Sequence, residues 1–227
     1  MATTLRWLGH NCWLLSTGEH TILVDPFLND SPTAPVKATA VKPDYILVSH
    51  GHFDHMADAA EIAQRTGATV VSNFEICQWL GKHGVKSSEP MNIGGTIELP
   101  FGRVKSTIAH HSSELPDGSG GGNPGGFLLS LPKCTIYFAC DTGLFLEMQL
   151  IGAAGLDLAV LPIGDRFTMG PSDSLEAIKL LAPKRVAPAH YNTWPPIAQD
   201  AQAWAARVRA ETKCEPIVLD PGGTINL

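Results

Sequence analysis

Short apolar stretches separated by turn-forming residues dominate the start of the chain. Residues 3–8, 12–16 and 21–24 are rich in β-branched and other apolar side chains, and glycine-containing breaks separate them. Such runs with brief breaks are typical of β-strands joined by tight turns. The pattern therefore predicts an antiparallel meander at the beginning of the fold.

The pattern changes after a loop that contains four prolines. Residues 45–48 form a continuous apolar run, which indicates a strand that is buried on both faces. Residues 57–65 then predict a helix, residues 68–72 a strand, and residues 73–82 a second helix that Asn73 can cap. This region alternates strand and helix.

The second half of the chain repeats this arrangement. Further strands are predicted at residues 96–99, 103–108, 127–131, 135–139, 157–161, 185–188 and 217–219, and further helices at 173–181 and 197–209. Asp173 and Glu176 form a candidate capping pair for the first of these helices. Two strand-rich halves that each close with helices predict an α+β fold, with two sheets packed face to face and helices outside.

Composition limits the partners that the protein can have. The 227 residues are 44% hydrophobic and 17% charged, which fits a single globular domain spanning residues 1–227. A formal net charge of −6 leaves no broad basic surface, so nucleic acid is an unlikely partner. A small-molecule substrate is expected instead, and the charge does not exclude an anionic one, because bound metal ions would dominate the local field.

Cysteine usage and the N-terminal sequence indicate the compartment. The five cysteines are odd in number and scattered, with no pair at a redox or zinc-ribbon spacing. No stretch approaches the roughly 20 apolar residues of a membrane span, and no leader-like segment opens the chain. We expect a cytoplasmic protein without a membrane partner. Trp194, Trp204 and Phe145 would permit a homo-oligomer if they were exposed, although core packing explains them equally well.

The densest chemistry in the sequence is the run S-H-G-H-F-D-H at residues 49–55. In an extended segment His50 and His52 point to the same side, and Gly51 between them adds no bulk. Asp54 and His55 follow directly, where a turn can aim a carboxylate and a third imidazole at a neighbouring point. Three histidines within six positions, in a chain that has nine, indicate a metal site rather than chance surface residues.

These residues match a known pattern. The run resembles the H-x-H-x-D-H signature of the metallo-β-lactamase superfamily, and further similar segments extend through nearly the whole chain. Those segments are L-G-H at residues 8–10, V-D-P-F at 24–27, A-C-D-T-G at 139–143, G-D-R-F-T-M-G-P at 164–171 and A-H-Y-N-T at 189–193. Together they resemble the metal-dependent hydrolase branch related to lactonase-like members of the L-ascorbate-6-phosphate lactonase type.

The resemblance implies an αββα sandwich with a dinuclear metal site at one edge, between the sheets. It implies two metal ions, one bound by His50, His52 and His111, the other by Asp54, His55 and His190, with Asp141 bridging them. In the branch pattern a histidine stands directly before paired serines, which selects His111 as the ligand and leaves His110 as its neighbour. The donor set suits zinc or manganese, and it also accommodates iron or nickel.

Five residues are candidates for auxiliary roles, as further ligands or as substrate contacts. His10 lies in a turn after the first strand, and Glu75 lies in a first helical turn, where helix capping explains it equally well. His110 adjoins the expected ligand. Asp165 and Arg166 belong to a loop that, in the family context, lines the mouth of the site.

The implied chemistry is hydrolysis by a metal-bound hydroxide, with Asp54 orienting the water or accepting its proton. We expect a phosphodiester, or a lactone or ester of a small metabolite, as the substrate. Two alternatives remain open at this point: an iron-dependent redox protein of the same fold, and a metal-binding module without catalysis. The glycine-rich loop at residues 118–126 is not a P-loop, because no Lys-Ser or Lys-Thr follows it; it is either a hairpin connection or a mobile lid.

Overall fold

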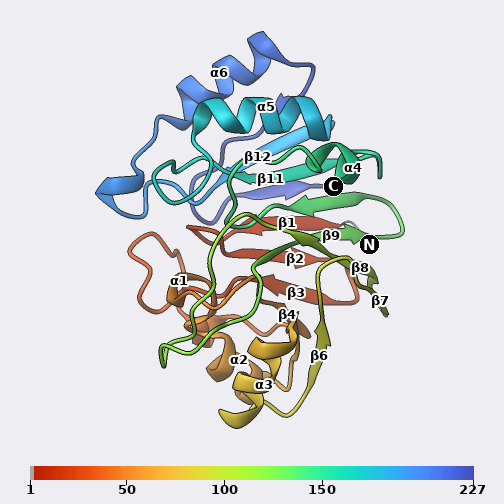
Figure 1. Cartoon of the computed structure of the whole chain (residues 1–227), viewed down its shortest axis with the longest axis vertical. Coiled ribbons are helices and arrows are strands. Elements are labelled where there is room, and N and C mark those ends of the chain that lie inside the picture. The colour runs from red at the N-terminus through yellow and green to blue at the C-terminus, as the bar shows by residue number, and fades with distance from the viewer. Residues whose placement is uncertain (1–2) are drawn as a thin grey trace.

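Two mixed β-sheets form the centre of the molecule, in a computed structural model that describes residues 3–227 (Figure 1). The first sheet has the order β14-β1-β2-β3-β4-β5-β6. Its strands are β1 Thr4–Trp7, β2 Trp13–Ser16, β3 Thr21–Val24, β4 Tyr45–Leu47, β5 Thr69–Asn73, β6 Ser88–Met91 and β14 Thr224–Asn226. The second sheet has the order β13-β12-β11-β10-β9-β8-β7. Its strands are β7 Thr96–Leu99, β8 Gly102–Ile108, β9 Gly125–Ser130, β10 Thr135–Phe138, β11 Leu158–Pro162, β12 Arg185–Ala189 and β13 Glu215–Pro216.

The helices lie outside the two sheets. The α-helices are α1 Phe53–Met56, α2 Ala59–Thr66, α3 Phe74–Lys82, α4 Met148–Gly152, α5 Pro171–Leu181 and α6 Ala201–Glu211. In Figure 1, α2 and α3 lie at the bottom beside the first sheet, and α5 and α6 lie at the top beside the second. The predicted αββα sandwich is confirmed.

Strand direction changes within each sheet, and this change positions the site. β1, β2 and β3 form the predicted antiparallel meander, after which β3, β4, β5 and β6 run parallel. In the second sheet β8, β9 and β10 are antiparallel, and β10 to β13 are parallel. β1 and β4 therefore point the same way within the first sheet, and β8, β10 and β12 share one direction within the second.

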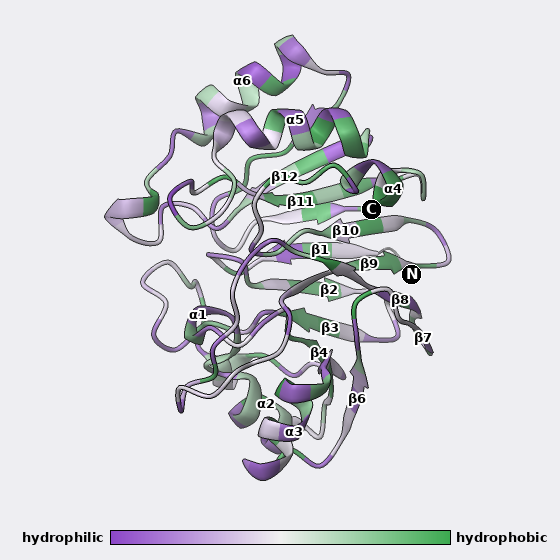
Figure 2. Cartoon of the chain, viewed as in Figure 1, coloured by the Kyte–Doolittle hydropathy of each residue, from purple (hydrophilic) through white to green (hydrophobic). Residues whose placement is uncertain are grey.

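Two hydrophobic clusters hold these layers together. The larger one fills the space between the sheets and beneath α5 and α6, and includes the buried Trp13 and Trp204. The smaller one packs α2 and α3 against the first sheet through Ile62 and Leu80. In Figure 2 green, hydrophobic segments lie along the central strands, while purple gathers on the outer turns of α3 and α6. This distribution is the one expected of sheets covered on their outer faces.

Several predicted boundaries were wrong for identifiable reasons. The helix predicted at residues 57–65 is α2, which begins two residues later at Ala59, and a separate helical turn, α1, precedes it where no helix was predicted. Helix α5 begins at Pro171 with Gly170 as N-cap, so Asp173 and Glu176 do not cap it. Proline is favoured at a first helical position because its missing N–H would have no partner there.

The C-terminal elements also differ from the prediction. The helix predicted at residues 197–209 begins at Ala201, because a 3₁₀ turn occupies Pro195–Ile197 and the Asp200 side chain caps α6. Residues 217–219 are not a strand; pairing with β12 is confined to β13 and one further bond from the N–H of Ile217. Strands β6 and β14 and helix α4 were not predicted, because they are short and, in β6, mostly exposed.

Burial also decides the role of several single residues. Trp204 and Phe145 are buried in the core, so they offer no surface for an oligomer, while Trp194 is half-buried. All five cysteines are free and buried. Among residues 3–227, no helix is long and apolar enough to cross a membrane.

Candidate metal centre

The predicted ligand residues all follow the carboxyl ends of strands. His10 follows β1, the histidine run follows β4, His111 follows β8, Asp141 follows β10, and His190 follows β12. Because these strands share a direction within each sheet, their ends meet at one edge of the sandwich, on both sides of the space between the sheets. Hydrogen bonds join the two sheets there: the His190 N–H donates to the His10 carbonyl, and the Gly125 N–H to the Ser49 carbonyl.

The histidine run folds as a strand end followed by one helical turn. His52 is the extended N-cap of α1, so Asp54 lies in the first turn, where a negative charge is favourable. Gly51 has a specific steric role, because a Cβ at this position would lie 2.8 Å from the carbonyl oxygen of Glu114. The glycine therefore lets the loop after β8, which carries His111, approach the run closely.

Left-handed backbone conformations occur at several points around this edge. His10, Asp25, Cys140 and His190 have φ angles of 50°, 45°, 54° and 52°. Non-glycine residues adopt this region rarely and at a cost of order 1–3 kcal/mol each. Each of the four directly follows a strand or lies in the turn after one, where the sharp reversal aims the next side chain, or its own, at the site.

Three imidazole nitrogens converge at the first candidate site. His50 Nε2 lies 2.9 Å from His52 Nδ1, and His111 Nε2 lies 3.2 Å from the same His52 atom. Tetrahedral ligands about 2.0–2.1 Å from a zinc ion would lie roughly 3.3 Å apart. The three rings can therefore hold one ion.

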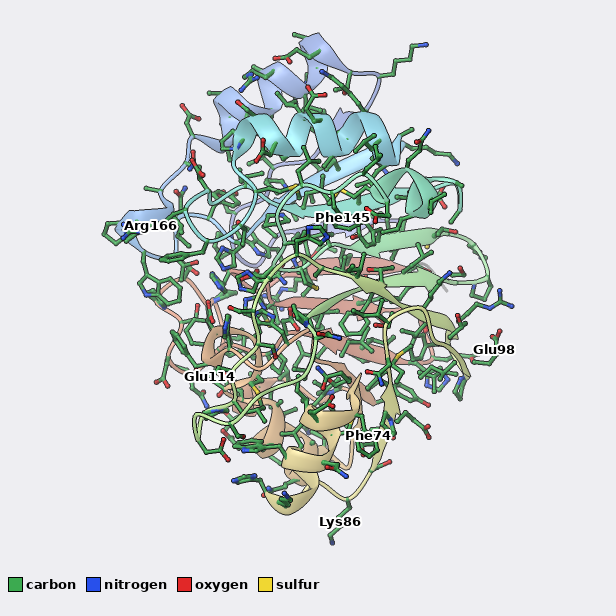
Figure 3. The ribbon with its side chains drawn as sticks, in the orientation of Figure 1. Phe74, Lys86, Glu98, Glu114, Phe145 and Arg166 are labelled. Carbon is green, nitrogen blue, oxygen red and sulfur yellow. The ribbon has the colours of Figure 1, made fainter. Side chains whose placement is uncertain are left out.

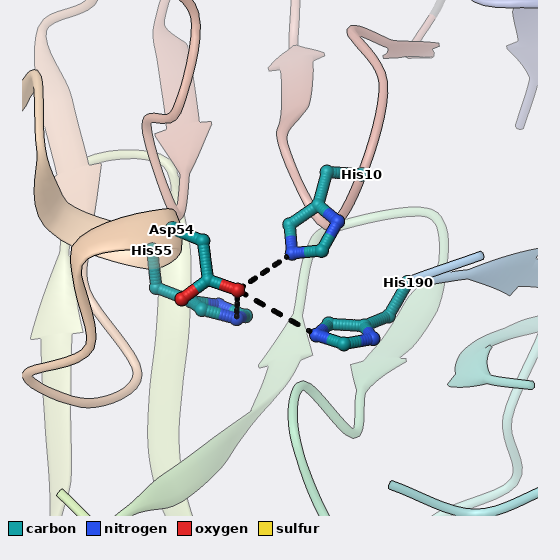
Figure 4. A group of neighbouring side chains, drawn as sticks. All are labelled: His10, Asp54, His55 and His190. Atoms are coloured by element: carbon teal, nitrogen blue, oxygen red, sulfur yellow. Dashed lines mark hydrogen bonds and ion pairs between the residues drawn. The ribbon is translucent and has the colours of Figure 1, made fainter. Parts of the chain in front are cut away.

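The second cluster surrounds the carboxylate of Asp54 (Figure 4). Asp54 Oδ2 lies 3.1 Å from His10 Nε2, 3.9 Å from His55 Nε2 and 3.8 Å from His190 Nε2. His10 is fully buried, and its other ring nitrogen lies 2.7 Å from the Thr193 hydroxyl. The structure thus brings His10 into contact with the expected ligand Asp54, which is the position that an auxiliary ligand would need.

Asp141 lies between the two clusters. Its Oδ2 is 3.0 Å from His190 Nε2, 3.3 Å from His55 Nε2 and 3.6 Å from His111 Nε2. Among the described residues, the buried Asp141 Oδ1 and His55 Nε2 make no hydrogen bond. A buried polar atom without a partner costs about 1–3 kcal/mol. Metal coordination would satisfy both atoms, so this donor set fits divalent metal ions.

Hydrogen bonds behind the cluster orient two of the rings. Asp25 is fully buried and its Oδ2 accepts from the Ser49 hydroxyl at 2.7 Å and from His55 Nδ1 at 2.8 Å. Because the Ser49 proton goes to Asp25, the Ser49 oxygen accepts from His50 Nδ1, at 2.9 Å. In their neutral forms both rings therefore carry their proton on Nδ1 and leave Nε2 free, which is the tautomer that a metal needs.

The pKa values within the cluster are displaced in opposite directions. Burial alone would raise the pKa of Asp141, but His190 and His55 beside it hold the pKa well below its usual range. Asp54 follows the same pattern, with His55 and His10 outweighing burial to lower its pKa. Burial lowers the pKa of His190, yet Asp141 reverses this and raises it to about 9. The carboxylates are therefore charged at neutral pH, as ligands must be.

Burial dominates at two other histidines. It lowers the pKa of His10 to about 4, with the charge of His190 adding to the effect, and it lowers the pKa of His50 well below 6.5. A neutral His10 has a single ring proton. If Nε2 donates it to Asp54, then Nδ1 accepts from the Thr193 hydroxyl.

Four of the five auxiliary candidates lie away from the cluster. His110 is exposed and its ring stacks on Phe145 at a centroid distance of 5.2 Å, while its neighbour His111 points into the site. Glu75 is exposed in the first turn of α3. Asp165 and Arg166 are exposed, and Figure 3 shows Arg166 at the edge of the molecule. None of these four lines the cavity at the cluster.

A cavity of about 590 Å³ opens above the cluster, and the loop at residues 164–171, which was expected at the mouth of the site, contributes Phe167 to its wall in place of Asp165 and Arg166. The residues that line it include His52, Asp54, His111, Asp141 and His190 at one end. Aromatic and aliphatic side chains form most of the rest, namely Phe53, Leu115, Pro116, Phe167, Trp194, Pro196 and Ile197, together with Gly51, Ser112 and Glu114. Phe53 comes from α1 and the other apolar side chains from the segments that follow β8, β11 and β12. The only signal in the sequence for most of them was that apolar residues occur close to the metal motifs.

Comparisons with known proteins agree with this geometry. A family model described as a β-lactamase superfamily domain matches residues 4–190. A UPF0173 metal-dependent hydrolase of Thermus thermophilus is 49% identical over 223 residues, covering 98% of each chain. A relative of the same description from Pyrobaculum calidifontis is 41% identical over 229 residues, covering 98% of this chain and 99% of its own.

Solved structures give the same result. A metallo hydrolase from the archaeon Ignicoccus hospitalis superposes with a TM-score of 0.91 at 34% sequence identity, covering 100% of this chain and 99% of its own. Both its fold and its length match. The chain therefore belongs to the metallo-β-lactamase superfamily and, within it, to the UPF0173 metal-dependent hydrolases.

Proposed function

We propose that the protein is a metal-dependent hydrolase that cleaves an ester or a lactone at the cluster of histidines and aspartates. The observation that carries this proposal is the position of Asp141, between two groups of imidazoles and with an unpaired oxygen, at the floor of an open cavity. The names of the relatives support the hydrolase class.

His50, His52 and His111 would hold one ion; Asp54, His55 and His190 would hold the other, and Asp141 would contact both. When bound, two divalent ions lower the pKa of water at the site and stabilise negative charge that develops on the attacked group. The protein then needs no nucleophilic side chain of its own.

The side chains have separable tasks. Asp25 and Ser49 hold the Nδ1 protons of His55 and His50, so that Nε2 is the atom each ring offers to a metal. Asp54 lines the cavity and is charged at neutral pH, so its Oδ2 can accept a proton from water. His10 holds that oxygen in place at 3.1 Å. In this role His10 positions Asp54 and does not contact substrate.

The cavity favours a carbonyl ester over a phosphodiester. Among the described residues that line it, none is a lysine or arginine, and the single charged residue beyond the cluster is Glu114. A phosphodiester keeps its negative charge at neutral pH and usually meets cationic side chains as well as metal ions. An ester or lactone has no such requirement.

The experiment is a hydrolysis panel of esters, lactones and phosphodiesters with the metal-loaded protein. We expect turnover of at least one carbonyl ester or lactone, and its loss in His50→Ala. His110→Ala is the matched control, because this neighbouring histidine points away from the cluster, and it is expected to retain activity. Turnover of phosphodiesters alone, or no turnover of any member with both sites loaded, would overturn the proposal.

A further inference from the structure

The wall of the cavity is apolar and partly exposed to solvent. Phe53 and Phe167 keep 59% and 54% of their surface exposed, although both line the cavity beside the cluster. Exposed apolar side chains that gather at the rim of a cavity, unlike ones scattered singly over the surface, often mark a ligand-binding site. Because Phe53 and Phe167 line the same cavity as Asp54 and Asp141, a bound substrate would cover their exposed faces.

The aromatic wall is braced from behind. Phe53 and Trp194 lie 6.0 Å apart between ring centroids, and the buried Phe27 contacts both, at 5.7 Å and 5.8 Å. The Arg166 guanidinium lies 5.5 Å from the Phe167 ring centroid. A wall supported in this way is already formed before a ligand arrives, which reduces the ordering cost of binding.

Charge within the cavity points to an uncharged ligand. Asp54, Asp141 and Glu114 are among the residues that line it, and none of the described lining residues is a lysine or arginine. Two divalent ions would carry four positive charges, of which Asp54 and Asp141 offset two, so the remaining positive charge is confined to the metal end of the cavity. Among the described residues that line the rest of it, no lysine or arginine can pair with an anionic group on the far part of a substrate. Carboxylate or phosphate substituents would therefore lie against apolar surface without a partner, which is costly.

Building on the hydrolase activity proposed above, we infer that the cavity binds the uncharged, apolar acyl or aryl part of an ester or lactone, with Phe53, Phe167 and Trp194 determining specificity. The volume of about 590 Å³ lies within the usual range for small-molecule sites. Each methylene that the wall removes from water should strengthen binding about two- to fourfold, the upper value being full burial.

The first experiment measures kcat/KM for p-nitrophenyl acetate, butyrate and hexanoate with the metal-loaded protein. We expect a rise of about two- to fourfold per methylene, and a p-nitrophenyl hemisuccinate that is at least tenfold poorer than the butyrate. Phe167→Ser should lower the value for hexanoate about tenfold and flatten the chain-length dependence. Phe74→Ser is the matched control, since Phe74 is 47% exposed on α3, outside the cavity, and should keep the wild-type profile.

The second experiment separates this inference from the proposed function. Binding of acetamide, butyramide and hexanamide, which are neutral and unreactive here, is followed by NMR titration of the protein with and without metal. Affinity that rises with chain length, and less so in Phe167→Ser, supports the apolar site even if no ester is hydrolysed. Ester turnover with a flat chain-length profile and amide binding independent of length would overturn the inference while leaving the hydrolase assignment intact.

Discussion

Asp25 offers a sharp test of how the metal ligands are oriented. Its Oδ1 accepts from the Ser49 N–H at 2.8 Å, and its Oδ2 accepts from Asn11 Nδ2, from the Ser49 hydroxyl and from His55 Nδ1. Asp25→Asn preserves the shape but replaces one of the two acceptors with an NH₂ donor. At the Oδ2 position this NH₂ would oppose three donors, so the amide will place it at Oδ1.

With the NH₂ group of the substituted amide at the Oδ1 position, the buried N–H of Ser49 loses its acceptor. The expected cost is about 1–3 kcal/mol in the free energy of unfolding of the metal-free protein. His55 and, through Ser49, His50 would also be held by a neutral acceptor in place of a carboxylate. Loss of such support behind a metal ligand usually lowers metal affinity about 10–100-fold, which corresponds to about 1.4–2.7 kcal/mol.

Asp58 provides the matched control, because it is another buried carboxylate, 4% exposed, that accepts backbone N–H groups. Its Oδ2 accepts from Leu28 and Asn29, and none of the hydrogen bonds at its side chain reaches a cluster residue. Asp58→Asn should destabilise the fold by about 1–2 kcal/mol, since two charge-assisted bonds become neutral ones. Its metal affinity should remain that of the wild type.

The assay has two parts: urea denaturation in chelator for stability, and competition with a chelator of known affinity for metal binding. Asp25→Asn should lose both stability and affinity, and Asp58→Asn stability alone. Equal metal affinity in wild type and Asp25→Asn would refute the argument that Asp25 sets the ring tautomers. An equal loss of affinity in both variants would show that general destabilisation is responsible.

Three further changes test other parts of the structure. Gly51→Ala places a Cβ against the Glu114 carbonyl and should weaken metal binding at least tenfold, as measured by chelator competition. Gly81→Ala is the control: it has open space around it in α3 and should stabilise the fold by up to about 1 kcal/mol in urea denaturation. Ser174→Ala removes the partner of the buried Trp204 Nε1, 2.8 Å away, and should cost about 1–3 kcal/mol in urea denaturation; no change would show that the indole finds another acceptor. In chelator, the free energy of unfolding should be greatest near pH 6.5. His10, with its pKa lowered to about 4, contributes stability that is fully present above pH 6.5 and is lost as the pH falls through 4. His190, with its pKa raised to about 9, contributes stability that is fully present below pH 6.5 and is lost as the pH rises through 9. Urea denaturation from pH 4 to 9 measures this profile, and stability that keeps rising from pH 6.5 to 9 would contradict it.

Periodic patterns of apolar residues predicted most of the fold, but the shortest strands and helices were not predicted. The strand at residues 96–99 was placed correctly, and Asn73 caps α3 as expected, with its side chain accepting from the Ile76 N–H. β6 was missed because three of its four residues are exposed, so no alternation marks it. β14 was missed because three residues carry no usable period, and its place beside β1 depends on contacts across the whole chain.

The residues of the candidate site were likewise predicted only in part. Sequence spacing and family resemblance identified His50, His52 and Asp54, because a strand end followed by one helical turn brings them together locally. The loop at residues 164–171 was expected at the mouth of the site, but Phe167 and Trp194 were not predicted as its wall, because they lie in loops after different strands that come together only when the sheet is assembled. Apolar residues in a loop also look the same in sequence whether they line a cavity or pack into the core.

The central claim is that the cluster at the sandwich edge holds two metal ions. Crystals grown with zinc or manganese, measured at the absorption edge of that metal, test it directly through anomalous scattering. We predict two anomalous peaks per chain, one within reach of His50, His52 and His111, and one beside Asp54, His55 and His190. A single peak, or peaks only outside the cluster, would contradict the account.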